Sequence, residues 1–97
     1  MKLIQRLAEM IDEEIDDAKK YALCYQQYKD EDPELAKTFS QLGFEELTHV
    51  DRLHAQVVRI IKKYRDDHGD PPANMQARYD YLHELSTRKA EVRLLLA

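Results

Sequence analysis

Residues 43–54 read GFEELTHVDRLH. In a helix, Glu46 and His49 would lie one turn apart on the same surface, because residues three and four apart are neighbours there. Three apolar residues share that surface at helical spacing: Leu42, Val50 and Leu53. An apolar helix surface normally packs against another part of the protein, so a carboxylate and an imidazole at its centre need a chemical reason.

Two short stretches rich in Asp, Gly and Pro divide the chain. KDEDPEL (29–35) contains Asp32, a residue type that favours the N-cap, and Pro33, which suits the first position of a helix. DDHGDPPAN (66–74) contains a glycine suited to a helix end and then repeats the Asp-Pro start signal. No stretch alternates as a strand does, so an all-α fold is predicted. The predicted helices cover residues 2–29, 33–67 and 72–95.

The first two helices are joined by a short loop and are expected to pack as a long antiparallel hairpin over residues 2–67. The third, C-terminal helix over 72–95 completes a single domain of 97 residues (1–97). A chain this short buries a modest core by itself, so association into a homodimer or a higher homo-oligomer is expected.

Composition argues against several classes of function. The formal net charge is −4, which disfavours nucleic acid as a partner because phosphate binding needs a basic surface. No apolar run approaches the ~20 residues that a membrane-spanning helix requires. Cys24 is the only cysteine, so no internal disulfide is expected. The first residues lack a signal-peptide core, and a cytoplasmic location is expected.

Glu14 and Glu46 are the two acids that lie within the apolar stripes of the hairpin. The first stripe contains Leu3, Leu7, Met10, Ile11, Ala18, Tyr21, Tyr25 and Tyr28. The second contains Leu35, Phe39, Leu42, Gly43, Val50, Leu53, Val57, Ile60, Ile61 and Tyr64. Position 30, in the turn, is the midpoint between the two acids. They should therefore lie level across the hairpin, about 24 Å from the turn at a rise of about 1.5 Å per residue.

Two neighbouring carboxylates in an apolar setting repel each other and lose hydration, and a bound cation relieves both penalties. Glu46 and His49 form the Glu-x-x-His element of carboxylate-bridged di-iron bundles. Such a centre takes a Glu from each of two helices and a Glu-x-x-His from each of two more. This chain supplies one of each, since Glu14 provides the single Glu. Two chains about a two-fold axis would complete the centre.

At these residues the chain resembles the ferritin-like superfamily, in particular rubrerythrins and the half-size, encapsulated-ferritin-like proteins. The resemblance covers residues 4–64. It rests on the spacing of Glu14 and Glu46, on EELTH, and on ELAKTFSQLGFEELTHVDRL (34–53), which is similar to rubrerythrin second helices. It implies that Glu14, Glu46 and His49 are metal ligands in a four-helix ferritin-like bundle completed by dimerisation.

Two further residues are candidates to support the ligands. Tyr21 matches an aromatic residue often found near such sites in the family that the chain resembles; a packing residue is the alternative. Glu45, four residues before His49, could accept a hydrogen bond from the imidazole and orient it; an exposed acid is the alternative. No tail resembling an encapsulin-targeting peptide follows residue 90, so an encapsulating shell protein is not expected as a partner.

Mixed carboxylate and imidazole ligands suit iron, manganese and zinc. Four carboxylates and two imidazoles around two ions favour iron or manganese, because zinc prefers fewer ligands and often sulfur. We therefore expect two iron ions per dimer, with manganese or zinc as alternatives. The expected activity is ferroxidase-like: Fe(II) is oxidised by oxygen, or by peroxide as in rubrerythrins, with Glu14, Glu46 and His49 as the catalytic residues.

A function from a different class fits the same pattern. The protein would then be a non-catalytic helical interaction or assembly module, with or without a structural metal. Glu14, Glu46 and His49 would form a polar network that fixes the register of a dimer. Metal analysis of the purified protein separates this reading from a ferroxidase.

Overall fold

The computed structural model describes residues 2–97, apart from the side chain of His83. Within that range the chain forms four α-helices: α1 (Lys2–Tyr28), α2 (Pro33–His68), α3 (Ala73–Glu84) and α4 (Ser86–Leu96). The described chain contains no strand, so the predicted all-α fold is confirmed. None of these helices is long and apolar enough to cross a membrane.

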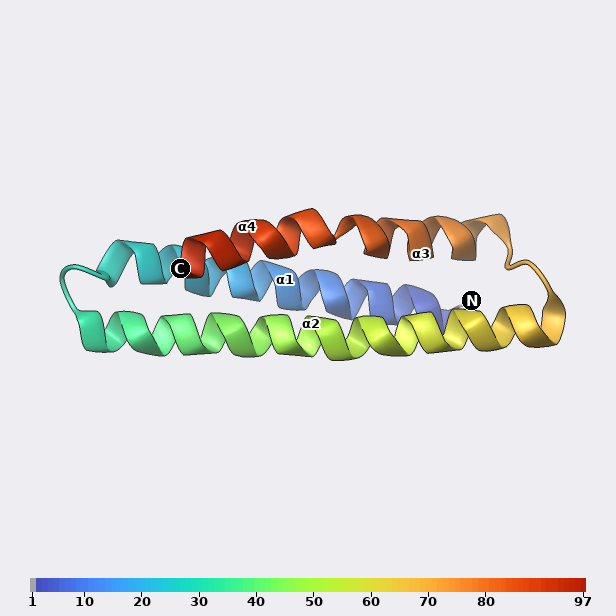
Figure 1. Ribbon diagram of the computed structural model, residues 1–97, viewed down its shortest axis with the longest axis horizontal. Helices are drawn as coiled ribbons and strands as arrows, with labels where there is room; N and C mark the ends of the chain where they lie inside the picture. Colours follow the sequence, from blue (N-terminus) through green and yellow to red (C-terminus); the bar gives the residue numbers. More distant parts are fainter. Residues whose placement is uncertain (1) are drawn as a thin grey trace.

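α1 and α2 form the predicted antiparallel hairpin, closed by the turn at residues 29–32 (Figure 1). After a second turn, α3 and α4 run back along the hairpin nearly in line with each other, and the chain ends near the first turn (Figure 1). The result is a rod of packed helices whose extents are 55 × 18 × 16 Å.

The ends of α2 follow the start and stop signals in the sequence. Asp32 accepts a hydrogen bond from the Leu35 amide at 3.1 Å, and Pro33 occupies the first helical position. At the other end Gly69 has a φ of 83°, a conformation that costs glycine little, and its amide donates to the Arg65 carbonyl at 2.9 Å. Both boundaries therefore lie within one residue of the predicted ones.

The third predicted helix is broken, so the expectation of one helix over 72–95 is wrong in this respect. Leu85 separates α3 from α4. Its amide donates to the Leu82 carbonyl, three residues back, at 3.3 Å, and the next helical bond from Lys89 returns to Leu85. Such a 3₁₀-type turn, closed by a hydrogen bond to the residue three positions back, is common where one helix ends and another begins. It keeps Leu82 and Leu85 both buried in the core.

The core lies between the hairpin and the α3–α4 segment. α1 buries one line of residues at alternating spacings of four and three: Ile4, Ala8, Ile11, Ile15, Ala18 and Ala22. α2 buries Ala36, Gly43, Leu47, Val50, Val57 and Ile61. α3, Leu85 and α4 contribute Met75, Leu82, Leu85, Val92 and Leu96. Gly43 allows a close approach, because a Cβ there would lie 2.9 Å from a methyl carbon of Leu96.

A second apolar line runs beside the buried one and is left uncovered. Much of each predicted stripe falls on this line; Leu3, Met10 and Leu35 are exposed, and Leu7 is half-buried. The α3–α4 segment covers the neighbouring line instead. We call the uncovered side the open face. Its residues are Leu3, Leu7, Met10, Glu14 and Tyr21 of α1 and Leu35, Phe39, Leu42, Glu46, His49, Leu53 and Ile60 of α2.

The packing of α3 on the hairpin should contribute strongly to the free energy of unfolding. Leu82 is 2% exposed, whereas Leu94, on the next helix, is 77% exposed. Leu82→Ala is expected to lower the free energy of unfolding by about 2–4 kcal/mol, because it removes buried methyl groups and leaves a cavity. The matched variant Leu94→Ala should change it by less than about 0.5 kcal/mol. Urea unfolding followed by circular dichroism measures both; equal losses would contradict the packing described above.

Candidate metal centre

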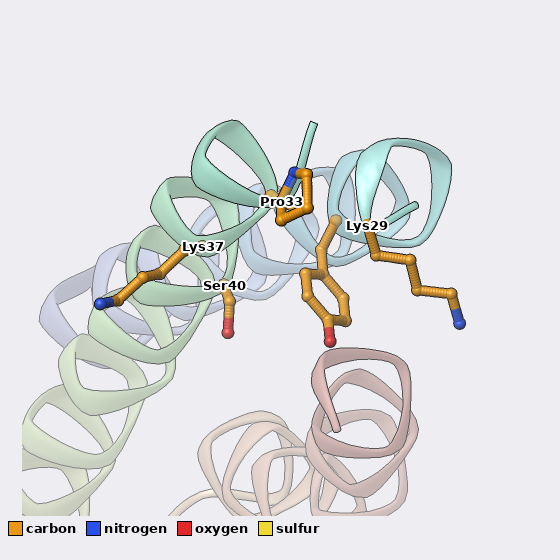
Figure 2. A pocket seen from close by; sticks show the side chains of 6 residues that line it. Lys29, Pro33, Lys37 and Ser40 are labelled. Atoms are coloured by element: carbon orange, nitrogen blue, oxygen red, sulfur yellow. The ribbon is translucent and has the colours of Figure 1, made fainter. Parts of the chain in front are cut away.

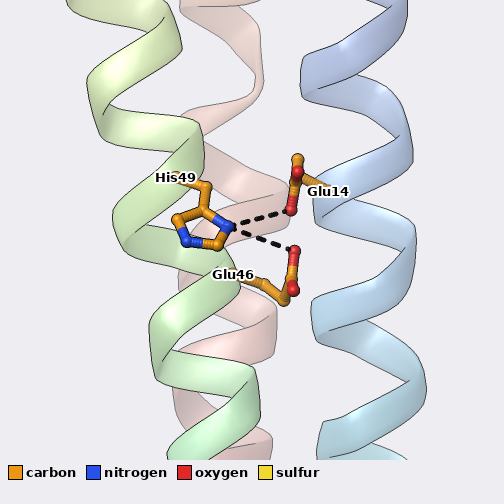
Figure 3. A group of neighbouring side chains, drawn as sticks. All are labelled: Glu14, Glu46 and His49. Carbon is orange, nitrogen blue, oxygen red and sulfur yellow. Dashed lines mark hydrogen bonds and ion pairs between the residues drawn. The ribbon is translucent and has the colours of Figure 1, made fainter.

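Three side chains from two helices meet near the middle of the open face. Glu14 projects from α1, and Glu46 and His49 project from successive turns of α2 (Figure 3). One ligand atom from each of the three lies within 4.8 Å of the other two. The acids are thus level across the hairpin, as their equal spacing from the turn predicts. In Figure 3 the C-terminal helical segment passes behind the group, which faces away from it.

One imidazole nitrogen lies between the two carboxylates. His49 Nδ1 is 3.3 Å from Glu14 Oε2 and 3.7 Å from Glu46 Oε2 (Figure 3). The first distance is a long hydrogen bond, and the second is an ion-pair distance only. An atom placed among these three would face two oxygen donors and one nitrogen donor. This donor set, borderline in softness, suits iron, manganese or zinc.

The Glu46 carboxylate fits a cation better than it fits the protein alone. Its side chain is 18% exposed, against 29% for Glu14 and 48% for His49. Glu46 Oε2 has almost no accessible surface and receives no hydrogen bond. A buried acceptor without a donor costs free energy, and more so when it is charged. A metal ion held by Glu14, Glu46 and His49 would satisfy that oxygen.

Sequence reasoning missed the ion pairs that hold α4 to the back of the hairpin. Arg88 donates to Asp12 at 3.1 Å and to Asp16 at 2.8 Å, both on α1. Lys89 pairs with Asp51 of α2. The basic residues of α4 were a signal that this helix forms ion pairs with the hairpin. Which acids they pair with depends on how α4 packs, and the sequence does not give that.

The two acids of the cluster, Glu14 and Glu46, have no lysine or arginine beside them in the described structure. Among residues 2–97, neither Glu14 nor Glu46 pairs with a lysine or an arginine, and His49 is the group that lies against both. Two like charges therefore lie close together on a partly apolar surface. Such a pair favours a cation between its members.

Tyr21 and Glu45 are not brought into the group. Tyr21 lies two turns from Glu14 and packs against Phe39, with ring centroids 6.4 Å apart. Phe39 also contacts Tyr28 at 6.2 Å, so these rings form a short aromatic ladder that leads to the turn. No hydrogen bond joins Tyr21 to the cluster in the described structure. Glu45 is exposed on the side of α2.

A separate hollow of about 310 Å³ lies at the hairpin turn (Figure 2). It is lined by Tyr25, Lys29, Pro33, Ala36, Lys37 and Ser40. In Figure 2 the amino groups of Lys29 and Lys37 extend away from it on opposite sides. The lining contains no acid, histidine or cysteine, so this hollow has no metal-ligating group of the kind found in the cluster.

Comparisons of the chain with protein-family models, with curated proteins and with solved structures find no match.

The unrelieved charge at Glu46 should destabilise the metal-free protein. With a chelator present, Glu46→Gln is expected to raise the free energy of unfolding by about 1 kcal/mol, because it removes a partly buried like-charge repulsion while keeping the shape. Glu45→Gln, one residue away and exposed, should change it by a few tenths of a kcal/mol at most. Urea unfolding at one fixed protein concentration measures both. A loss of stability in Glu46→Gln would argue that the carboxylate is well satisfied without metal.

Proposed function

We propose that this chain is a half-size, ferritin-like di-iron carboxylate protein with ferroxidase-like activity, working in the cytoplasm as a homodimer. In this proposal two copies pack open face to open face and hold two iron ions between them. The observation that carries it is the convergence of Glu14, Glu46 and His49 on the side of the hairpin that α3 and α4 leave uncovered.

The need for a second copy follows from the ligand count. One chain offers two carboxylates and one imidazole, whereas a di-iron carboxylate centre takes four carboxylates and two imidazoles. A two-fold pair doubles the set without any further residue type. The open face also presents Leu3, Met10 and Leu35 to solvent, and a partner on that face would bury them.

The ligand types support oxidation of Fe(II). Carboxylates favour the ferric state, because their negative charge stabilises the more highly charged ion. Each Fe(II) ion, as substrate, gives up one electron. Two electrons with two protons convert one hydrogen peroxide into two waters, or one dioxygen into hydrogen peroxide. Glu14 and Glu46 would hold the ions, and His49 of each chain would supply a further ligand.

Iron content should depend on Glu46 and be insensitive to Glu45. The wild-type protein loaded anaerobically with Fe(II) is expected to retain one iron per chain, which is two per dimer. Glu46→Ala should lose stoichiometric binding and keep its helices, because it removes a ligand from a preformed helical face. Glu45→Ala should bind as the wild type does. Elemental analysis after gel filtration, with circular dichroism on the same samples, measures the outcome; unchanged iron in Glu46→Ala would contradict the site.

Turnover should require both the histidine and the pairing of chains. Wild-type protein is expected to oxidise Fe(II) faster than buffer alone, with consumption of oxygen or added peroxide. His49→Ala should lower this rate at least about tenfold, since losing a metal-ligating group costs at least as much as losing its orienting partner. Thr48→Ala, on the exposed neighbouring position, is the control. Equal rates for His49→Ala and Thr48→Ala would overturn the assignment of His49 as a catalytic residue.

One contact favours the non-catalytic alternative. His49 lies 3.3 Å from Glu14, within reach of a hydrogen bond, so the cluster would then serve as a polar network that fixes how two helical hairpins align. A metal-free dimer that is indifferent to chelator would support that function. A dimer that binds iron and consumes no oxidant would identify a structural metal.

A further inference from the structure

α2 is longer than the helix beside it. Residues equally far from position 30 are level across the hairpin, so Lys2, where α1 begins, is level with Val58. Residues 58–68 of α2 therefore extend past the start of α1 (Figure 1). We call this segment the overhang. α3 covers its inner side, where Ile61 is buried, but α1 does not reach its open side.

The overhang carries a small, mainly apolar pocket. It has a volume of about 180 Å³ and is lined by Ile60, Lys63, Tyr64, Asp67 and His68. The floor is formed in part by the Tyr64 and His68 rings, which stack with centroids 4.7 Å apart. Ile60 and Tyr64 are each half-buried. The pocket continues the line of the open face beyond the end of α1.

The two ends of the hairpin carry opposite charge. The hairpin tip, which we define as residues 29–37, contains four acids and two lysines. The overhang contains four bases and two acids, and one of these acids, Asp67, lines the pocket beside Lys63. Lys62 and Lys63 are exposed and form no ion pair in the described structure. A pairing of tip with tip would bring acids together, whereas a pairing of tip with overhang brings opposite charges together.

The positions of the apolar residues along the open face favour the same pairing of tip with overhang. If a two-fold axis perpendicular to the helices passes between Glu46 and His49, Leu35 of one α2 faces Ile60 of the other. The same axis places Leu42 opposite Leu53. All four are apolar residues of the open face, and none of them is fully buried in one chain.

We propose that the overhang pocket receives the hairpin tip of a second copy of this chain, in an antiparallel two-fold dimer. Leu35 of each copy lies against Ile60 of the other, and the acids of each tip lie close to Lys63, which lines the pocket. The contact occurs twice, once at each end. This inference rests on the proposed pairing of two chains across the open face; it does not depend on which metal the cluster binds.

Disulfide trapping tests the arrangement. In a Cys24→Ser background, the double variant Leu35→Cys/Ile60→Cys is expected to form a covalent dimer under mild oxidation. Each single variant should stay non-covalent, because two copies of residue 35 would lie at opposite ends of the dimer, roughly 38 Å apart at about 1.5 Å per residue. Non-reducing gels and native mass measure the products.

Two results would overturn the inference. Covalent dimers of the Leu35→Cys single variant would place both tips at the same end. A native mass equal to one chain at all concentrations would leave no second copy to occupy the pocket. Fe(II) oxidation by the same samples separates this inference from the proposed function. Trapping without oxidation upholds the dimer and overturns the ferroxidase; oxidation with trapping at residue 35 alone does the reverse.

Charge reversal gives an independent test that needs no cysteine. Lys63→Glu is expected to weaken dimerisation about fivefold. Lys62→Glu, on the opposite side of α2 from Ile60, should have little effect. Adding Glu31→Lys and Glu34→Lys to the Lys63→Glu chain should restore dimerisation, because the opposite charges then exchange places. Lys19→Glu, on the exposed side of α1, is the control and should have little effect. Dimer dissociation measured by analytical ultracentrifugation checks this; failure of the added lysines to restore association would contradict the contact between tip and overhang.

Discussion

The antiparallel packing of α1 against α2 determines every other feature of this molecule. Because the hairpin folds about position 30, it fixes which residues are level, and so it brings Glu14 to the turns that carry Glu46 and His49. The same packing leaves the hairpin with two apolar sides. α3 and α4 cover one of them with Met75, Leu82 and further apolar side chains, and the other is the open face.

The cluster opposes the stability of the fold that carries it. Apolar residues at these positions would pack the face more favourably than two close carboxylates, one with an oxygen that receives no hydrogen bond. Such a local cost is characteristic of functional positions, where chemistry rather than stability determines the residue. The back of the hairpin is strengthened by contrast: Arg88 and Lys89 neutralise acids on both helices there. The acids beside α4 are thus paired with basic side chains, whereas Glu14 and Glu46 have His49 between them.

The hairpin and the meeting of Glu14 with Glu46 could be predicted because both follow from local signals. Asp32 and Pro33 mark the turn, and the helical repeat on each side of it then places Glu14 level with Glu46. The side covered by α3 and α4 could not be predicted in the same way, since two lines on each helix are nearly equally apolar. A signal did exist: the buried lines contain small residues such as Ala18, Ala22 and Gly43, which permit close approach. The break at Leu85 could not be predicted either, because no glycine or proline lies near it in the sequence.

The position of the chain's last residues has an evolutionary consequence. α4 returns to the α1–α2 turn, so Ala97 lies at the opposite end of the rod from the start of α1 (Figure 1). In an antiparallel pair, the end of one subunit would then lie at the same end of the assembly as the beginning of its mate. Gene duplication with a connecting peptide that crosses the bundle could join them into one polypeptide. Each half would then be free to diverge, so that the two ligand sets of the proposed centre need no longer be equivalent.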